Sequence, residues 1–190
     1  SFDTYNDNKN NLYNILATLA AIFSYVNVLN LKKDIFLNFK IPNGRGDISK
    51  IKFDNKKIFL VDETYNSNPL SLKIAIENFD KIPVKKSKKY LILGDMLELG
   101  KHSVKQHKLI CKIVNKTKIN QVYVVGKYIK ETFKGLKLNK KAKILKNNFD
   151  IIKMIKKNLN NNDYLMIKGS NSTGLYKITN ELKRRSSHVI

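Results

Sequence analysis

The sequence is short of cysteine and of acidic residues, and both shortages narrow the possible functions. Cys111 is the single cysteine among 190 residues, so no disulfide can form within the chain. A chain without disulfides fits a reducing compartment, and we expect a cytoplasmic protein. There are 15 Asp and Glu against 37 Lys and Arg, which gives a formal net charge of +22. Such a charge admits nucleic acid or another polyanion as a partner.

Long apolar runs are also scarce. The longest apolar region, residues 15–31, is interrupted by Thr18, Ser24, Asn27 and Asn30, so we expect no membrane span. The first residues lack the basic segment and apolar core of a signal peptide. The sequence also lacks an initiator Met, which leads us to expect a fragment or a processed start. Hydrophobic residues still make up 42% of the chain, enough for a real core.

The positive charge is spread along the chain rather than gathered in one block. Arginine, the better reader of bases, occurs only at Arg45, Arg184 and Arg185. We therefore interpret the lysines mainly as solvated faces and expect no nucleic-acid partner, while a polyanion-binding module remains the alternative. Lysine pairs occur along the whole length, for example at residues 32–33, 56–57, 85–86, 140–141 and 156–157.

After residue 45 the sequence alternates between strand and helix patterns. Such alternation predicts an α/β fold with a mostly parallel sheet and helices on both faces. The first two strands are joined by only three residues, 54–56, so that pair must be antiparallel. The predicted strands are 47–53, 57–61, 90–93, 121–125, 142–145 and 164–167, and the predicted helices are 69–79, 104–116, 128–133, 149–159 and 173–184.

The first 45 residues follow a different pattern. Apolar residues at helical spacing predict an amphipathic helix over 11–28, and a second short helix is expected over 32–39. Residues 41–46 have turn chemistry. Two helices and a loop cannot bury their own apolar faces, so we expect residues 1–45 to be the end of a preceding domain.

A polar loop follows the predicted strand 57–61. Asp62, Glu63, Tyr65, Asn66 and Asn68 lie where open α/β sheets bind ligands, at the carboxyl end of a strand. Asn68 can cap the next helix, and a proline fits its first position. The alternative is an ordinary capped loop.

Two more loops follow predicted strands in the same way. Residues 93–100 hold Asp95 and Glu98, and Ser103 with Gln106 predicts a capping box for the helix that carries His107. A histidine on an apolar helix face is more often a hydrogen-bonded core residue than a catalyst. Residues 168–174 have the glycine spacing of a phosphate loop but lack the Lys and Ser or Thr that a Walker A motif requires.

These three stretches together resemble the Mur ligases. Residues 61–69, Val-Asp-Glu-Thr-Tyr-Asn-Ser-Asn-Pro, are similar to the family's Asp-Asp-x-Tyr-Asn-Ala-Asn-Pro signature, and residues 93–100 with His107 and residues 167–170 agree with it. The resemblance covers essentially the whole chain. It implies the end of a central ATP-binding domain over 1–45 and a Rossmann-like carboxy-terminal domain over 46–190.

The resemblance also implies an activity and its ligands. The activity is ATP-dependent amide-bond formation that joins D-alanyl-D-alanine to a UDP-N-acetylmuramoyl tripeptide through an acyl phosphate, for peptidoglycan synthesis. The cofactors are ATP and Mg²⁺, with the metal ligands expected outside these residues. A monomer is expected. A sibling ligase of the folylpolyglutamate type is disfavoured by Tyr65-Asn66-Ser67-Asn68-Pro69 together with Lys168-Gly169-Ser170.

Site residues follow from the matched motifs. The family's His-Asn-x-x-Asn and Gly-Arg motifs correspond to residues 10–14 and 44–45. Departures are Asn10 for His, Glu63 for Asp, Asn171 for Arg and Tyr176 for Glu, which leave activity and substrate specificity open. The predicted nucleotide contacts are Asn11, Asn14, Arg45, Asp62 and Glu63; the predicted substrate contacts are Tyr65, Asn66, Asn68, Lys168 and Ser170; and Asp95, Glu98 and His107 are predicted to position loops.

A first prediction concerns turnover. No Gly-x-x-x-x-Gly-Lys-Ser/Thr sequence occurs in these 190 residues, so we expect the isolated chain to hydrolyse no ATP. Phosphate release can be measured with MgATP, the muramoyl tripeptide and D-alanyl-D-alanine all present. Release above a no-enzyme blank by the pure chain would contradict the expectation.

Overall fold

The computed structural model describes residues 2–3, 9–37 and 43–187. The chain divides into two compact units, residues 1–41 and 42–190, which are considered separately below. The division lies close to the predicted domain boundary between residues 45 and 46. The assignment of the first unit to a central ATP-binding domain stays a prediction.

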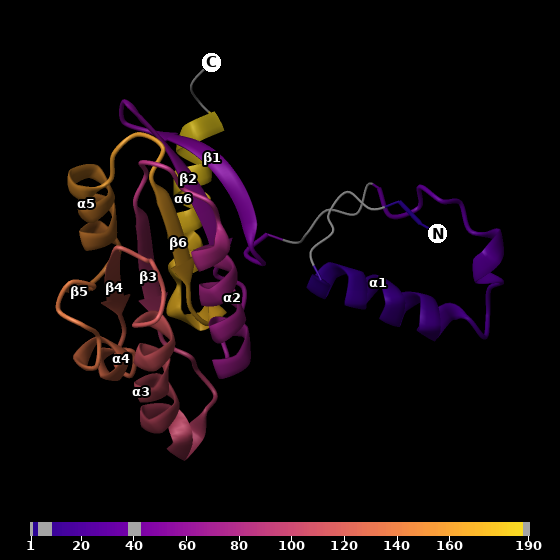
Figure 1. Ribbon diagram of the computed structural model, residues 1–190, viewed down its shortest axis with the longest axis horizontal. Coiled ribbons are helices and arrows are strands. Elements are labelled where there is room, and N and C mark those ends of the chain that lie inside the picture. Colours follow the sequence, from indigo (N-terminus) through magenta and orange to yellow (C-terminus); the bar gives the residue numbers. More distant parts are fainter. Residues whose placement is uncertain (1, 4–8, 38–42, 188–190) are drawn as a thin grey trace. The chain divides into compact units, whose positions relative to one another are not determined.

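The larger unit contains a six-stranded sheet (Figure 1). Its only antiparallel pair is β1 with β2, in register from Asp47 opposite Asp62 to Phe53 opposite Lys56, and the other neighbouring strands run parallel within the described residues. This confirms the predicted fold class. The strand order is β1 (Asp47–Phe53), β2 (Lys56–Glu63), β6 (Tyr164–Lys168), β3 (Lys89–Gly94), β4 (Gln121–Val125) and β5 (Lys141–Leu145).

Helices cover both faces of this sheet. α2 (Pro69–Lys81), α3 (Ser103–Val114) and α4 (Lys130–Lys134) pack on one face, and α5 (Asn148–Asn158) and α6 (Leu175–Ser187) pack on the other. Side chains alternate along each strand, so Leu60 contributes to the core beneath α5 and α6 while Val61 contributes to the core beneath α2 and α3. Every residue of β3 is buried, as expected for a central parallel strand.

The first unit differs from the sequence expectation. Its helix, α1 (Lys9–Ile22), ends before the predicted residue 28, and a 3₁₀ turn, η1 (Val28–Asn30), follows. The Asn27 side chain caps this turn by accepting a hydrogen bond from the Leu29 N–H. The predicted helix over 32–39 is wrong in its described part, because residues 32–37 form turns and a bridge. So short a segment cannot sustain a helix alone, and Ile35 is 49% exposed, so packing adds little to its stability.

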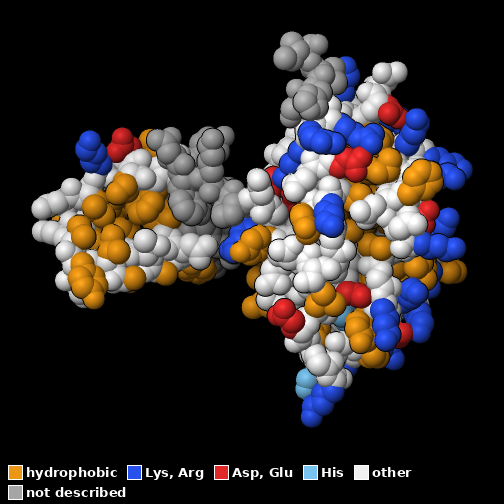
Figure 2. Space-filling view, turned by 180° about the vertical axis from the view of Figure 1, so that it is seen from behind, with side chains coloured by type: hydrophobic (Ala, Val, Ile, Leu, Met, Phe, Trp, Pro, Cys, Tyr) orange, Lys and Arg blue, Asp and Glu red, His pale blue; other side chains and the backbone are white. Residues whose placement is uncertain are grey.

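The apolar face of α1 is largely uncovered within the described part of its unit. Ile15 is buried, whereas Leu12 and Leu16 are 37% and 59% exposed. Figure 2 shows apolar side chains at the surface of this unit. No helix in the described ranges is long and apolar enough to cross a membrane.

The predicted capping box at Ser103 and Gln106 is also wrong. A 3₁₀ turn, η2 (Gly100–His102), runs directly into α3, and His102 has helical backbone angles in place of an extended N-cap. Ser103 is therefore already inside the helix, where its hydroxyl cannot cap the first turn.

Several lysines cap carbonyl groups at the ends of helices. The Lys56 ammonium donates to the carbonyls of Lys156 and Leu159, at 2.8 and 2.7 Å, at the end of α5. The buried Lys140 ammonium donates to the carbonyls of Thr117 and Ile119, at 2.6 and 2.8 Å, after α3. Many other lysine side chains are scattered among apolar and acidic side chains over the face of the larger unit that Figure 2 shows. Part of the basic composition therefore stabilises the fold.

We expect Lys140→Met to lower the free energy of unfolding by about 1–3 kcal/mol, because two carbonyl groups lose their donor. Lys143→Met, at an exposed lysine of β5 three residues further along the chain, is the matched control and should change stability little. Urea unfolding followed by circular dichroism measures both, and equal effects of the two substitutions would contradict the capping role.

Candidate functional site

Three loops meet at the carboxyl edge of the sheet because the strands that they follow are neighbours. β2, β6 and β3 lie side by side in that order, and residues 64–68, 169–174 and 95–99 leave their carboxyl ends. The three stretches that carry the family resemblance are therefore brought together. Their side chains form the candidate site.

The first loop ends in a rigid helix start. The Asn68 side chain accepts a hydrogen bond from the Ser71 N–H at 2.8 Å, the Ser71 hydroxyl accepts one from the Asn68 N–H, and Pro69 begins α2. This confirms the predicted cap. The side-chain oxygen of Asn68 is therefore engaged in capping α2.

A buried ion pair joins the first loop to the second. Lys168 is 1% exposed, and its ammonium lies 3.2 Å from a carboxylate oxygen of Glu63 and donates to the Asn66 carbonyl at 2.9 Å. Burial lowers the pKa of Lys168 against the opposing effect of Glu63. Burial likewise raises the pKa of Glu63, although Lys168 opposes the shift. Lys168 anchors the two loops, and its predicted substrate contact stays a prediction.

Ser170 joins all three loops. Its hydroxyl donates to the Ser67 carbonyl at 3.2 Å and accepts from the Leu97 N–H at 2.9 Å, while its own N–H donates to the Asp95 carbonyl. The Ser67 hydroxyl, in contrast, is buried without a partner among the described residues.

The third loop is fixed by Asp95 and His107. The Asp95 carboxylate accepts hydrogen bonds from the N–H groups of Lys127 and Ile129, at 2.8 and 2.7 Å. His107 is fully buried, and its Nε2 accepts from the Met96 N–H while Nδ1 lies 2.7 Å from the Ser103 carbonyl. These contacts give both residues a structural role in the loop. Glu98 is exposed and its side chain has no partner in the described chain, so its positioning role stays a prediction.

A turn before β1 places Arg45 against the first loop. Gly44 and Gly46 have φ of +79° and +89°, which only glycine adopts freely. A Cβ at Gly44 would lie 2.9 Å from the Tyr65 nitrogen, whose N–H donates to the Gly44 carbonyl. The Arg45 guanidinium consequently stacks 4.3 Å from the centroid of the Tyr65 ring.

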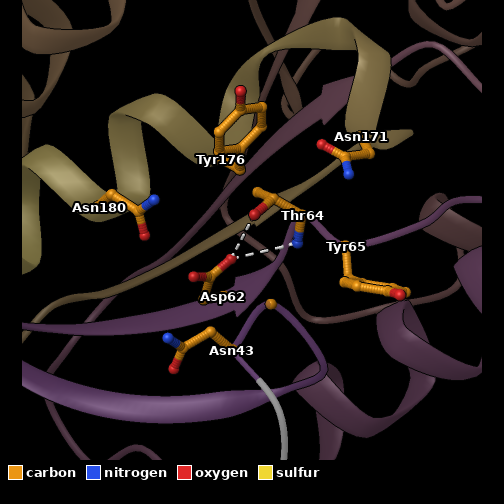
Figure 3. Close-up of a pocket in the computed structure, with 8 residues that line it drawn as sticks. Asn43, Asp62, Thr64, Tyr65, Asn171, Tyr176 and Asn180 are labelled. Atoms are coloured by element: carbon orange, nitrogen blue, oxygen red, sulfur yellow. Dashed lines mark hydrogen bonds between the residues drawn. The ribbon is translucent and has the colours of Figure 1, made fainter.

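Beside this turn lies a pocket of about 340 Å³ (Figure 3). Asp62 is at its base, with one carboxylate oxygen accepting from the N–H and hydroxyl of Thr64, at 3.2 and 2.7 Å. The other oxygen accepts from the Lys183 ammonium at 2.8 Å, which also contacts Asp47. The pocket is lined by Asn43, Gly44, Asp62, Thr64, Tyr65, Asn171, Tyr176 and Asn180.

Sequence reasoning missed part of this arrangement. Asn43, Asn180 and Lys183 were not predicted as site residues, and no motif marks them in a chain rich in Asn and Lys. Asn14, from the first unit, is exposed, and the Asn11 side chain lies outside the described residues. The nucleotide contacts predicted for these two asparagines stay predictions.

Comparison with known proteins assigns the family. A family model described as "Mur ligase, glutamate ligase domain" matches residues 49–171. This chain belongs to the Mur ligase family. The match runs from within β1 to within the loop after β6 and so includes most of the sheet and the motif stretches 61–69, 93–100 and 167–170, and the resemblance seen in the motifs is confirmed.

Relatives of this Mur ligase chain carry one enzyme name. The UDP-N-acetylmuramoyl-tripeptide--D-alanyl-D-alanine ligase of Buchnera aphidicola subsp. Acyrthosiphon pisum is 33% identical over 183 residues, 93% of this chain and 37% of that protein. The ligase of the same name from Rickettsia prowazekii is 31% identical over 154 residues, 78% of this chain and 33% of that protein. The chain therefore spans little more than one third of the length of these relatives.

Solved structures share the fold of this Mur ligase chain. MurF ligase from Thermotoga maritima, solved in complex with ADP, superposes with a TM-score of 0.70 and 23% identity, over 93% of this chain and 38% of that one. MurF from Acinetobacter baumannii gives a TM-score of 0.69 and 19% identity, over 92% and 37% of the two chains.

Removing the unpaired hydroxyl at residue 67 should stabilise the chain. We expect Ser67→Ala to raise the free energy of unfolding by about 1 kcal/mol, since a buried hydroxyl without a partner costs desolvation energy. Ser170→Ala, which removes a bonded hydroxyl in the same crevice, should lower it by about 1–3 kcal/mol. Urea titrations compare the two, and a loss of stability in both would contradict the assignment.

Breaking the ion pair should destabilise the loops in a pH-dependent way. We expect Lys168→Met to lower the free energy of unfolding by about 2–4 kcal/mol at pH 7, because the half-buried Glu63 carboxylate loses the ammonium that pairs with it. Without Lys168 the pKa of Glu63 rises further above its usual value of 4.5.

A raised carboxyl pKa favours the protonated folded state, so the stability deficit should grow as pH rises from 4.5 through the folded pKa and shrink below 4.5. Glu63→Gln combined with Lys168→Met is the control and should recover part of the loss. Denaturant unfolding at pH 4 and pH 7 measures this, and an equal deficit at both would contradict it.

Proposed function

We propose that this chain is the carboxy-terminal portion of an ATP-dependent ligase that adds D-alanyl-D-alanine to a UDP-N-acetylmuramoyl tripeptide. The family match and the shared name of its relatives support this substrate pair. The observation that carries the proposal is the crevice at the carboxyl edge of the sheet, where Lys168 and Ser170 tie together three motif loops. Such an edge is where α/β sheets bind ligands.

ATP supplies the phosphoryl group that activates the tripeptide carboxylate for attack by the amine of the dipeptide. In the proposed arrangement Arg45 is held over the Tyr65 ring with its planar fork directed to phosphate or ribose oxygens. Asp62 and Glu63 are the proposed acceptors for ribose hydroxyls, and Asn11 and Asn14 are proposed for the adenine edge.

The substrate side of the proposal uses the loops beyond β2 and β6. Lys168 and Ser170 are the proposed partners of the dipeptide carboxylate, and Lys168 would share its ammonium between that carboxylate and Glu63. Tyr65, Asn66 and Asn68 are the other proposed substrate contacts. Asp95, Glu98 and His107 are proposed to hold the neighbouring loop in place.

Mg²⁺ does not fit this part of the ligase. The described residues contain no group of three or more His, Cys, Asp or Glu side chains gathered as metal ligands. We propose that ligands for the metal come from outside them, and that the ligase acts as a monomer in the cytoplasm. A polyanion-binding module finds little support, because the lysines are dispersed and several cap helices.

Binding to the chain as it stands tests the proposal. In a ¹H–¹⁵N NMR titration, we expect D-alanyl-D-alanine to shift the amide signals of residues 94–100 and 167–174. L-alanyl-L-alanine is the matched control, and it should shift them less. Shifts that are equal for both dipeptides, or absent at these loops, would overturn the substrate assignment. A labelled DNA duplex that stays bound near physiological salt would support the polyanion module instead.

A further inference from the structure

One stretch of the chain is almost free of acidic residues. Between Glu98 and Asp150 the sequence has a single acid, Glu131, while lysine recurs throughout. The Glu131 carboxylate is already paired, since it lies 2.6 Å from the Lys134 ammonium. The stretch runs through α3, β4, α4 and β5, and β4 and β5 form the end of the sheet away from β2 and its pocket. The lysines of this end therefore have almost no acids of their own segment to compensate them.

The exposed face of α3 carries a stripe of lysines. Lys105, Lys108 and Lys112 are exposed and follow the three- and four-residue spacing that places side chains on one face of a helix, and Lys116 continues the spacing just after the helix. Within the described residues, none of these four ammonium groups is paired with a carboxylate. The opposite face of α3 is buried and contains Ser103, His107, Ile110, Cys111 and Val114.

The turn after α4 is fixed against the end of this stripe. The Asn115 side chain donates to the Gly135 carbonyl and accepts from the Lys137 N–H, both at 2.9 Å. Further along the two helices, the Thr132 hydroxyl donates to the His107 carbonyl at 2.6 Å. α3 and α4 therefore form one continuous surface on the same side of the sheet, and the exposed Lys137 extends the stripe (Figure 1).

Aliphatic side chains stand exposed among these lysines. Leu138 follows Lys137 directly and is 87% exposed, and Leu109 follows Lys108 and is 40% exposed. The surface therefore combines unpaired ammonium groups with apolar groups that lack cover. We call it the basic face, and it consists of Lys105, Lys108, Leu109, Lys112, Lys116, Lys137 and Leu138.

We propose that the basic face is a docking surface for a membrane that contains anionic phospholipids. Phosphate groups of such lipids create a negative surface potential that attracts clustered lysines. The aliphatic stems of the lysines, with Leu109 and Leu138, fit the boundary between headgroups and acyl chains, while the ammonium groups stay in water. The contact is peripheral, and it does not depend on the proposed ligase function.

The side chains of the basic face favour a membrane over nucleic acid, the other common polyanion. Arginine, which binds phosphates and base edges through its planar fork, is missing from residues 46–183. The basic face also contains no aromatic side chain on which a base could stack. Exposed leucines add nothing to contacts with a sugar-phosphate backbone, whereas they gain from burial at a lipid boundary.

Vesicle binding by the 190-residue chain tests the inference. In cosedimentation at about 0.1 M salt, we expect the chain to bind vesicles made of equal parts phosphatidylglycerol and phosphatidylcholine, and to bind less as the salt is raised. Vesicles of phosphatidylcholine alone should bind it at least about tenfold more weakly, and they control for the exposed apolar face of α1. Equal binding to both kinds of vesicle, or none to either, would overturn the inference.

A pair of double variants tests the position of the surface. Lys108→Gln with Lys112→Gln should lower the partition coefficient on the anionic vesicles by about tenfold or more, because each lysine near the surface contributes about fivefold. The matched control is Lys153→Gln with Lys157→Gln, which removes the same charge at the same spacing from exposed positions of α5, on the other face of the sheet. It should change the partition coefficient less than about twofold. Equal losses in the two would mean that net charge alone attracts the chain, and would overturn the inference.

Leu138→Ser separates the membrane from nucleic acid. It should weaken binding to the anionic vesicles about threefold to fivefold, because an apolar side chain is lost from the lipid boundary, and should leave binding to a labelled DNA duplex unchanged. Vesicle binding that Leu138→Ser leaves unchanged, together with duplex binding that the Lys108 and Lys112 substitutions weaken, would assign the basic face to nucleic acid. All variants change exposed side chains, and circular dichroism should show the same fold for each.

Discussion

A buried ammonium group holds the candidate site of this chain together. Lys168 reaches from the end of β6 to Glu63 and to the backbone of Asn66, so one side chain fixes the relative position of two loops. Its burial is costly unless the charge is paired and hydrogen-bonded, and both partners come from the loop after β2. That loop therefore cannot move away from β6 without leaving a buried charge unpaired, which makes the crevice a preorganised surface.

The requirement that ammonium groups be paired or hydrogen-bonded also explains part of the basic composition. Lys56 donates to carbonyls at the end of α5, Lys140 donates to carbonyls in the segment that follows α3, and Lys183 bridges Asp47 and Asp62 across β1 and β2. A formal charge of +22 is typical of proteins that bind polyanions, yet several of these lysines form hydrogen bonds or ion pairs within the chain. Lys183, for example, compensates the negative charge of the Asp62 carboxylate at the base of the pocket.

The pocket and the crevice lie next to each other because of the strand order. β2 lies between the antiparallel edge strand β1 and the parallel strand β6, so the loop that follows β2 is next to residues from both of these strands. On one side it receives Arg45 from the turn before β1, and on the other it receives Lys168. The proposed nucleotide and dipeptide contacts are therefore next to each other, as the proposed ligase reaction requires, because its reactants must meet.

The sequence by itself determined the α/β class, the antiparallel first pair, the cap at Asn68 and the three motif loops, because these depend on local patterns and short connections. Two local predictions were wrong. Residues 32–37 form no helix, and a 3₁₀ turn that continues into α3 takes the place of the predicted capping box. The tertiary structure alone decided the strand order and the partners of Lys168 and Lys183, because these contacts join residues more than 100 positions apart and no local pattern encodes which distant groups will meet.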